Sequence, residues 1–328
     1  MKKAIKALLT IAFLGVLGIR IYGYLGPYTA AHEQSFVEIE RGMSSRAIAE
    51  TLAERGLVRS PWAFLAVRAV HPRARLQAGE YRFGTVQSPS EIFGKISRGD
   101  VFYELLTIPE GSSTFDVAAL LERGGTIAAD DFLKAASDAS SIRDLDSGAP
   151  NLEGYLFPST YRVTHATTAA QLCHMMTTEF RKQWQLLGGN APDAHRIVTL
   201  ASLVEKESAL PNERPLIARV FANRLRLQMP LQCDPTTVYA AMLENRYRGV
   251  IRKSDLASPN AYNTYTHTGL PPGPIANPGA QSLAAALKPA DVNYLYFVAK
   301  PGNSGSQEFS TTLAEHNLAV ERYRKAVR

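Results

Sequence analysis

Cysteine is scarce in this sequence, and long charged runs and metal-binding spacings are missing from it. Two cysteines in 328 residues exclude a disulfide-stapled scaffold, and 45% hydrophobic residues exclude a disordered chain. The 36 basic and 30 acidic residues leave a net charge of +6, with no long Lys/Arg run beyond the amino terminus, so no nucleic-acid partner is expected. None of the seven histidines has the spacing H-x-x-x-H, and neither a metal site nor a cofactor is expected.

The chain does have enough length to bury a substantial core. Its 328 residues suggest two compact domains, or one large domain with an accessory module. Patterns typical of strands and of helices both occur along the chain. We therefore expect an α+β protein with an amino-terminal transmembrane helix, a small α/β module and a larger mixed α+β domain.

The amino terminus has the pattern of a membrane segment. Three lysines (Lys2, Lys3 and Lys6) precede an uncharged run at 7–19, whose thirteen residues would suit the core of a cleaved signal peptide. Arg20, however, lies where its stem could reach the lipid headgroups, tyrosines follow, and no clean A-x-A cleavage site precedes the soluble part. We expect residues 1–6 in the cytoplasm, an uncleaved anchor at 7–28, and export of everything beyond about residue 28.

The two cysteines allow one intramolecular disulfide. Export would permit a bond between Cys173 and Cys233, but two buried free thiols fit the sequence equally well. A Cys/His nucleophile at Cys173 and His174 is poorly supported, because adjacent residues of a helix point to different faces.

An internal repeat relates residues 35–56 to residues 104–125, at an offset of 69 positions. Each copy predicts an alternating strand, a glycine turn, a Ser/Thr cap and a helix. The matched pairs are Ile39 and Ile108, Gly42 and Gly111, Ser44 and Ser113, Ala49 and Ala118, and Leu52 and Leu121. Two copies are too few for a solenoid.

The first copy belongs to a small module at 32–100. A second helix at 61–70 and a short strand at 79–83 complete the order strand, helix, helix, strand. This order resembles a LysM module, a glycan-binding unit of cell-wall proteins, although an α+β spacer would show the same pattern. A short helix at 90–98 leads to a strand at 101–108, where we place the start of the larger domain, 101–328.

Two acidic positions stand out in the larger domain. The segment 151–163 is too rich in Gly, Pro and aromatics for a helix, and its one acid, Glu153, lies among apolar residues. Residues 196–228 predict two helices broken near 210–212, the first with a buried stripe that ends at Glu205 and Glu207. Periodicity favours Glu207 slightly as an extension of the apolar face, where desolvation would raise its pKa as a general acid requires. A surface E-K-E run at a helix end is the simpler interpretation.

Downstream segments carry polar and aromatic side chains suited to sugar binding. Gln232 and Asp234 precede Pro235 and a Thr pair, and 258–279 is dense in Asn, Tyr, Gly and Pro. That composition predicts a packed loop, with Tyr262, Asn263 and Tyr265 available for hydrogen bonding and for stacking on sugar rings. A strand at 294–299 and a final helix carrying His316 and Asn317 complete the chain.

These segments together resemble the endolytic murein transglycosylases, the YceG-like family. The resemblance rests on motifs that occur in order over about 150–317. They are LEGYLFPSTY (152–161), VEKES (204–208), ERPLIARVFANRL (213–225), LQCDPT (231–236), AYNTYTHTGLPPGPIANPG (261–279), YLYFV (294–298) and EFSTTLAEHN (308–317).

The resemblance implies a single-pass inner-membrane enzyme whose periplasmic domain cleaves nascent peptidoglycan strands internally, with penicillin-binding synthases as partners. It maps the catalytic acid onto Glu207 and implies that Glu153 lines the cleft. Gln232, Asp234, Asn263 and Tyr262 are candidates for holding substrate. The chain departs from the family at Ser159, where many relatives carry Asp, and at Cys233, where Thr is usual; we assign Cys233 no function.

The implied reaction is that of a lytic transglycosylase, which needs one carboxyl where most glycosidases need two. Glu207 would protonate the MurNAc–GlcNAc β-1,4 oxygen and then deprotonate the MurNAc 6-hydroxyl, giving a 1,6-anhydro end. Two alternatives stay open. One is a hydrolytic muramidase with Glu153 or Asp234 as second carboxylate, and the other is a non-catalytic wall-binding scaffold.

Overall fold

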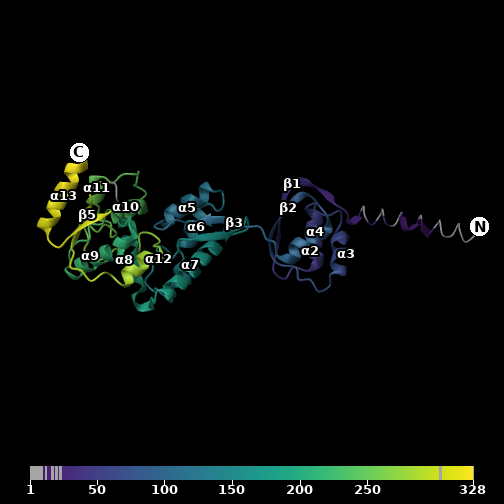
Figure 1. Ribbon diagram of the computed structural model, residues 1–328, viewed down its shortest axis with the longest axis horizontal. Coiled ribbons are helices and arrows are strands. Elements are labelled where there is room, and N and C mark those ends of the chain that lie inside the picture. Colours follow the sequence, from purple (N-terminus) through teal and green to yellow (C-terminus); the bar gives the residue numbers. More distant parts are fainter. Residues whose placement is uncertain are drawn as a thin grey trace, which may run out of the picture. The chain divides into compact units, whose positions relative to one another are not determined.

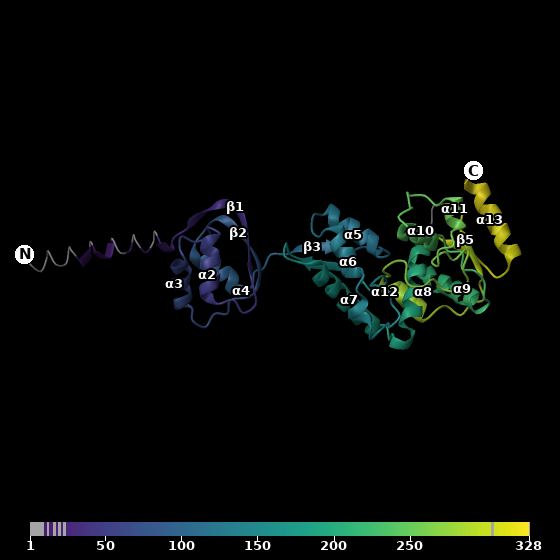
Figure 2. The same cartoon turned by 180° about the vertical axis from the view of Figure 1, so that it is seen from behind.

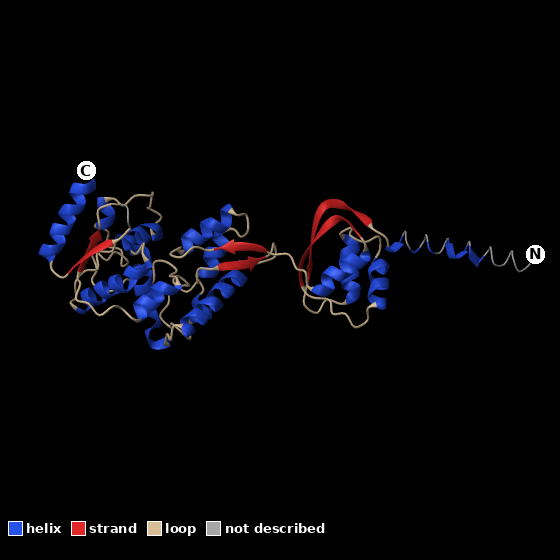
Figure 3. Ribbon diagram, in the orientation of Figure 1, coloured by secondary structure: helices blue, strands red, loops and turns tan. Residues whose placement is uncertain are grey.

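The chain forms an α+β structure that divides into two compact units. The computed structural model describes residues 10–11, 13–15, 18, 21, 24–302 and 305–327. Unit 1 comprises Met1–Glu104 and Arg162–Ala166, and unit 2 comprises Leu105–Tyr161 and Thr167–Arg328 (Figure 1). Strands in the described residues form two-stranded sheets, β1 with β2, β3 with β4 and β5 with β6, among more numerous helices (Figure 3).

The expected anchor falls partly outside the described residues. Residues 1–6 are not among them, and neither are ten of the 22 residues at 7–28. Within the part of the chain that is described, no helix combines the length and the apolar character needed to cross a bilayer.

Unit 1 has the strand, helix, helix, strand order that the sequence predicts. Its elements are β1 (Tyr28–Ile39), α2 (Ser45–Glu54), α3 (Pro61–Val70), β2 (Gly79–Gln87) and α4 (Pro89–Arg98). β1 and β2 pair antiparallel, with Ser35 opposite Phe83 and Ile39 opposite Gly79. Alternate residues such as Val37 and Tyr81 face the helices and are buried in one core.

A short segment from the middle of the sequence, Arg162–Ala166, belongs to unit 1. The backbone N–H of His165 donates to Glu80 Oε2 at 3.0 Å, and its Nδ1 lies 3.1 Å from Glu80 Oε1. The His165 ring also contacts two aromatic rings, with centroids 4.5 Å from Phe36 and 5.6 Å from Phe102. The chain therefore leaves unit 1 and returns to it before it completes unit 2.

Unit 2 is mainly helical. Its elements are β3 (Glu104–Thr107, which begins at the boundary), α5 (Thr114–Arg123), α6 (Ala129–Ala136), the 3-10 turn Ala139–Ile142, β4 (Thr160–Val163, whose last two residues belong to unit 1), α7 (Ala169–Leu186), the 3-10 turn Ala191–Asp193, α8 (Ala194–Glu207), the 3-10 turn Pro211–Glu213, α9 (Arg214–Arg226), α10 (Asp234–Leu243), α11 (Lys253–Leu256), α12 (Ala280–Leu287), β5 (Tyr296–Ala299), β6 (Gln307–Ser310) and α13 (Leu313–Val327). The predicted break between two helices near 210–212 is confirmed.

The repeat at 69 positions is confirmed as local structure. Gly42 and Gly111 turn the chain with φ angles of 85° and 73°, which glycine adopts without steric cost. Ser44 then caps α2 by accepting from Ala47 N, and Ser113 caps α5 by accepting from Asp116 N. Both copies therefore begin a helix in the same way.

α8 is the central helix of unit 2 and carries the candidate acid at its carboxyl end. It packs against α9, α10 and α12, which surround it in Figures 1 and 2. Every residue from Ile197 to Val204 is buried, so the predicted one-sided stripe is in fact a helix covered on all sides. Besides these helices, the loop 258–279 contributes to the cover, since Ser202 Oγ accepts from Ile275 N at 3.1 Å.

Candidate active site

Glu207 is the last residue of α8 and is half-buried. The helix ends there because Ser208 adopts an extended backbone, while its N–H still donates to Val204 O at 3.1 Å. A carboxyl at the end of a buried helix is held in place by the packing of the preceding turns. Glu207 therefore combines a fixed backbone with a side chain that solvent can reach.

The surroundings of Glu207 favour its neutral form. Burial raises the pKa of the Glu207 carboxyl above its ordinary value, and the negative charge of Asp234 raises it further. The Cys233 thiol, which is a hydrogen-bonding neighbour of this carboxyl, and the positive charge of Arg224 act in the opposite direction. The net result is a raised pKa, as a general acid needs near neutral pH.

Glu205, the other acid of the motif, has a different environment. Its side chain is 5% exposed and forms an ion pair with Arg214 at 3.1 Å. The second oxygen accepts from the backbone N–H of Gly279 at 2.9 Å. Lys206, between the two acids, donates to Gly111 O. Glu205 is thus a buried structural residue, and the interpretation of the E-K-E motif as a surface run is wrong.

The corner at 231–234 brings a second group of side chains to Glu207. Gln232 is exposed and has a φ of 52°, a left-handed conformation that is uncommon for a non-glycine residue. Cys233 is 1% exposed, and its N–H donates to Thr264 Oγ1 at 3.0 Å. Cys173 and Cys233 are both buried and free, so they form no disulfide.

Asp234 begins α10 and stays exposed beside this corner. Its Oδ1 accepts from the hydroxyl of Tyr265 at 2.5 Å. Burial first, and then the bond to Asp234, raise the pKa of Tyr265, so this hydroxyl keeps its proton and remains a donor. Asp234 is a candidate predicted from the sequence, and Tyr265, which was expected to be available for sugar binding, holds it in place.

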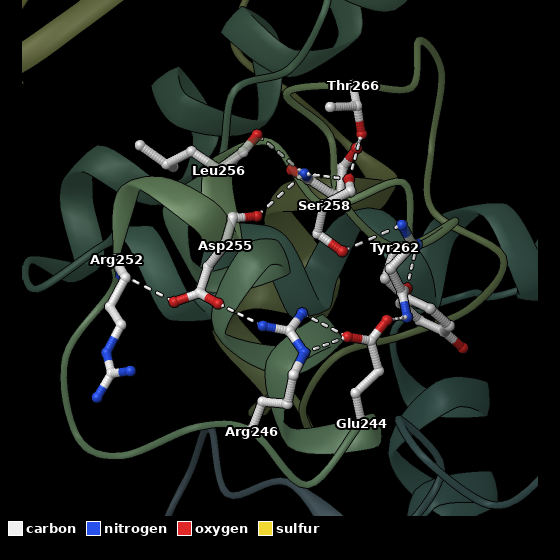
Figure 4. A network of polar contacts seen from close by, with 10 residues as sticks. Glu244, Arg246, Arg252, Asp255, Leu256, Ser258, Tyr262 and Thr266 are labelled. Atoms are coloured by element: carbon white, nitrogen blue, oxygen red, sulfur yellow. Dashed lines mark hydrogen bonds and ion pairs between the residues drawn. The ribbon is translucent and has the colours of Figure 1, made fainter.

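The loop that carries Tyr265 is fixed by a polar network, shown in Figure 4. Arg246 bridges Glu244 and Asp255, with 2.7 Å between its Nη1 and Asp255 Oδ1 (Figure 4). Asn263 is fully buried and donates to the carbonyl oxygens of Asp255, Leu256 and Ser258. The side-chain amide of Asn263 is therefore occupied by partners within the loop. This position supports a structural role for Asn263 and not contact with a sugar.

Tyr262 and Glu153 lie together, in a different environment from Glu207. The Tyr262 ring packs on Tyr239, with centroids 5.0 Å apart, and burial followed by the charge of Glu153 raises the pKa of Tyr262 to about 12. The Tyr239 hydroxyl donates to Glu153 Oε2 at 3.1 Å. The Tyr262 ring thus packs against Tyr239 in the interior and does not lie beside Glu207.

Glu153 is 1% exposed and joins three segments of unit 2. Its oxygens accept from Thr114 N and Oγ1, at 2.9 and 2.8 Å, and from Asn277 Nδ2 at 3.1 Å. Burial raises the pKa of Glu153 to about 7 despite these donors. The adjacent Gly154 has a φ of 87°, and a side chain there would lie 2.5 Å from Pro274. Because Glu153 is enclosed, the structure places it in the interior and not in a cleft.

Arg224 is a charged neighbour of Glu207 and is not among the site residues predicted from the sequence. It is 9% exposed, and its guanidinium donates to the carbonyl oxygens of Leu295 and Leu231 at 2.7 and 2.9 Å. The Tyr296 ring lies 5.2 Å from Arg224 and stacks on His316 at 5.1 Å. Only its place in the motif ANRL marked this residue, because a basic residue in an amphipathic helix is usually solvated.

The structure thus assembles one cluster from α8, α9 and the 231–265 region. Glu207, Cys233, Asp234, Tyr265 and Arg224 act on one another there. Chemically, the cluster offers the Glu207 carboxyl with its raised pKa, the exposed carboxyl of Asp234, and the positive charge of Arg224, which can stabilise an anion. This is a set suited to acid–base chemistry on an uncharged polar substrate.

Comparisons with known proteins find relatives that match most of the chain. An endolytic murein transglycosylase of Bacillus subtilis is 33% identical over 307 residues, covering 88% of this chain and 84% of that protein. An endolytic murein transglycosylase of Streptococcus pneumoniae strain R6 is 30% identical over 318 residues, 87% of this chain, and this chain matches 57% of its length.

A solved structure of a YceG-like protein from Listeria monocytogenes matches with a TM-score of 0.56 at 31% identity, covering 88% of this chain and 99% of that one. The model of the YceG-like family matches residues 37–322, which include most of each unit and every residue of the cluster. The chain therefore belongs to the YceG-like family.

Proposed function

We propose that this protein is a membrane-anchored endolytic lytic transglycosylase of peptidoglycan, with Glu207 as its acid and base. The observation that carries the proposal is the half-buried Glu207 carboxyl, whose pKa is raised by burial, in a chain similar to named endolytic murein transglycosylases. The alternative acid, Glu205, is committed to Arg214 and Gly279.

In the proposed reaction, protonated Glu207 donates its proton to the glycosidic oxygen as the bond from MurNAc C1 to GlcNAc O4 breaks. An oxocarbenium-like centre develops at C1. The carboxylate of Glu207 then takes the proton of the MurNAc 6-hydroxyl while O6 bonds to C1. The products are a free GlcNAc 4-hydroxyl and a 1,6-anhydroMurNAc end, no water is consumed, and Glu207 recovers its proton.

Two neighbours support this cycle of proton loss and gain. Asp234 favours the protonated carboxyl before cleavage, and Arg224 favours the carboxylate that exists between the two transfers. The nucleophile belongs to the substrate, so correct placement of the 6-hydroxyl supplies much of the rate.

The setting that we propose is the inner membrane, with residues 1–6 in the cytoplasm, an anchor at 7–28 and the catalytic unit in the periplasm. The support is the charge and apolar pattern of the amino terminus. Unit 1, with its strand, helix, helix, strand order, is proposed as a LysM-like module that places nascent glycan strands, and penicillin-binding synthases are the proposed partners.

The test compares Glu207→Gln with Glu205→Gln in the purified full-length chain, using uncrosslinked glycan strands as substrate and mass spectrometry of the products. Glu207→Gln should fold normally and lose cleavage by at least about 10³-fold, since it removes the group that transfers both protons. Glu205→Gln should melt at a lower temperature because it loses its charge opposite Arg214, but should keep most activity per folded molecule. Undiminished cleavage by Glu207→Gln would refute the assignment and leave the non-catalytic scaffold as the better account.

A hydrolytic muramidase is the second candidate, because Asp234 supplies a second exposed carboxyl beside Glu207. Glu153 is unsuited to that role, since it is enclosed and its oxygens are occupied by donors. Hydrolysis adds one water to each new reducing end, whereas the lytic reaction adds none. Products one water heavier than the anhydro form would therefore favour hydrolysis.

A further inference from the structure

Helix α3 of unit 1 has an exposed face without polar residues. Every residue of this helix that is exposed is apolar: Trp62, Ala66, Ala69 and Val70. Trp62 is 71% exposed and Val70 is 76% exposed. Because a helix turns by about 100° per residue, the four side chains share one face of α3. A helix on the surface of a soluble domain normally carries charged and polar residues there.

The opposite side of α3 is apolar as well. Ala63, Phe64 and Val67 are buried in unit 1, where α3 packs against α2 and α4. α3 lies at an edge of the unit, with both of these helices on its inner side (Figures 1 and 2). A helix that is apolar all round is usually covered on all sides. The exposed face of α3 is therefore suited to contact with a surface outside unit 1.

The chain around α3 is strongly basic. Residues 55–79 contain five arginines and one histidine but neither aspartate nor glutamate. Arg59 precedes the helix, Arg73 and Arg75 follow it, and all three are exposed. Positive charge therefore flanks the apolar face at both ends of α3. This combination is typical of helices that lie on an anionic lipid surface, where lipid covers the apolar face and phosphate groups attract the basic residues.

The start of α3 is joined to the end of the expected anchor. The Tyr24 hydroxyl forms a hydrogen bond with Oγ of Ser60, the residue that directly precedes α3. The Arg59 guanidinium lies 5.3 Å from the centre of the Tyr28 ring. Tyr24 and Tyr28 both belong to the end of the segment 7–28. An anchor that crosses a bilayer in this segment would place the start of α3 at the bilayer surface.

We propose, on the basis of the membrane anchor proposed above, that α3 lies in the interface of the same bilayer and binds anionic phospholipid. The side chains of Trp62 and Val70 insert between the headgroups, a depth at which tryptophan is enriched in membrane proteins. Arg59, Arg73 and Arg75 contact the lipid phosphates. Unit 1 is thereby held against the membrane by a second contact besides the anchor.

Other occupants fit the exposed face of α3 less well. A second copy of the chain would meet this face with the same face in a symmetric contact, which would bring the positive charges of both copies together. A glycan strand presents hydroxyl groups, and three of the four exposed side chains, Ala66, Ala69 and Val70, have no hydrogen-bonding group to offer them. A bilayer with anionic phospholipid matches both the apolar face and the flanking charge.

The test reconstitutes the purified full-length chain in vesicles and uses Trp62 as the probe. The other tryptophan, Trp184, is buried, so subtracting the spectrum of Trp62→Phe from that of the wild type isolates the emission of Trp62. In vesicles of equal parts phosphatidylcholine and phosphatidylglycerol, this emission should be blue-shifted and quenched by brominated acyl chains. In phosphatidylcholine alone, or at high salt, both effects should weaken because the electrostatic attraction is absent or screened.

A charge variant tests the electrostatic part of the proposal. Each arginine near an anionic surface contributes about fivefold to binding, so combining Arg59→Gln, Arg73→Gln and Arg75→Gln should lower the ratio of docked to undocked α3 by roughly 100-fold. Quenching of Trp62 reports this ratio. The matched control removes the same charge from three exposed arginines of unit 1 outside residues 55–79 and should leave Trp62 quenched; these are Arg41, Arg46 and Arg98.

A second variant tests the apolar part. Val70→Asp places a negative charge on the exposed face of α3 and should abolish the quenching of Trp62, whereas circular dichroism should show an intact fold because the site is exposed. The control is Leu186→Asp, at a residue of α7 that is 71% exposed, and it should leave the quenching unchanged.

Quenching by brominated lipid that depends on phosphatidylglycerol and on the three arginines supports the proposal. Absence of quenching overturns it, also where Trp62 is shielded from acrylamide, since protein or glycan would then cover the face. Equal quenching in neutral lipid, or in the triple arginine variant, overturns the assignment of anionic phospholipid. Flotation of the vesicles after a carbonate wash reports the anchor separately. A wild type that carbonate removes contradicts the anchor of the proposed function, whereas the quenching of Trp62 still decides whether α3 binds lipid.

Discussion

Replacing Glu153 by glutamine should remove a pH dependence of stability that this one carboxyl imposes on unit 2. Burial raises the pKa of Glu153 from 4.5 to about 7 in the folded protein. The folded state therefore holds a proton that the unfolded chain has released, and the free energy of unfolding falls as the pH rises from about 4.5 to about 7. The two pKa values correspond to a loss of roughly 3 kcal/mol over this range.

Glutamine is the appropriate replacement because it resembles the protonated carboxyl in shape and charge. A carbonyl at the Oε1 position can accept from the Thr114 and Asn277 nitrogens, and an NH₂ at the Oε2 position can donate to the hydroxyls of Thr114 and Tyr239, which can rotate to accept. The variant should thus match the wild type near pH 4.5 and be more stable than it at pH 7.5.

The chain offers a convenient probe for this measurement. It has two tryptophans: Trp184 is 3% exposed in α7 of unit 2, and Trp62 is 71% exposed in α3 of unit 1. In a Trp62→Phe background, fluorescence reports the melting of unit 2 alone. For a unit of this size, roughly 3 kcal/mol corresponds to a melting temperature that falls about 6–12 °C further in the wild type than in Glu153→Gln between pH 4.5 and 7.5.

The control is Glu122→Gln, which removes the same charge from an exposed position of α5. Its curve of melting temperature against pH should run parallel to that of the wild type. A parallel curve for Glu153→Gln as well would refute the reasoning, because it would mean that Glu153 binds its proton equally well in the folded and unfolded states.

Two further changes test the packing around the cluster. Arg214→Met leaves Glu205 charged and buried, and should lower the free energy of unfolding of unit 2 by about 3–5 kcal/mol in guanidinium titrations. The control Arg226→Met, at an exposed position, should lower it by less than about 0.5 kcal/mol. Equal effects would contradict a buried ion pair between Arg214 and Glu205. Gly154→Ala, at a φ of 87° and against Pro274, should lower the melting temperature with a cost above about 1 kcal/mol, and an unchanged melt would show that the turn can relax.

Much of the backbone could be predicted because it depends on local patterns. The Ser44 and Ser113 caps, the two glycine turns and the break near 210–212 are each fixed by a few adjacent residues, and the structure has them as expected. The environment of α8 could not be predicted, because burial on all sides depends on α10 and α12, which lie further along the sequence, as well as on the adjacent α9. Hydrophobic periodicity detects a face but not how many neighbours cover the remainder.

The candidate site divides in the same way. Side-chain chemistry suggested Asn263 as a sugar ligand, but three backbone carbonyl groups occupy its amide, and no pattern in the sequence reports that. Conversely, Cys233 and Tyr265 belong to the candidate site because Cys233 interacts with Glu207 and Tyr265 binds Asp234, and these pairs come together only after folding. The sequence can name residue types suited to a reaction, whereas the contacts that orient them are tertiary.

The return of Arg162–Ala166 to unit 1 limits how the two units can be exchanged between related proteins by recombination or in chimeras. The chain passes from one unit to the other three times, after residues 104, 161 and 166. A single crossover at residue 104 would therefore exchange most of unit 1 but leave behind the segment whose His165 binds Glu80. A recombinant or a chimera that keeps both units intact must therefore exchange the five residues 162–166 together with the rest of unit 1. For this reason a single crossover cannot exchange either unit as a whole.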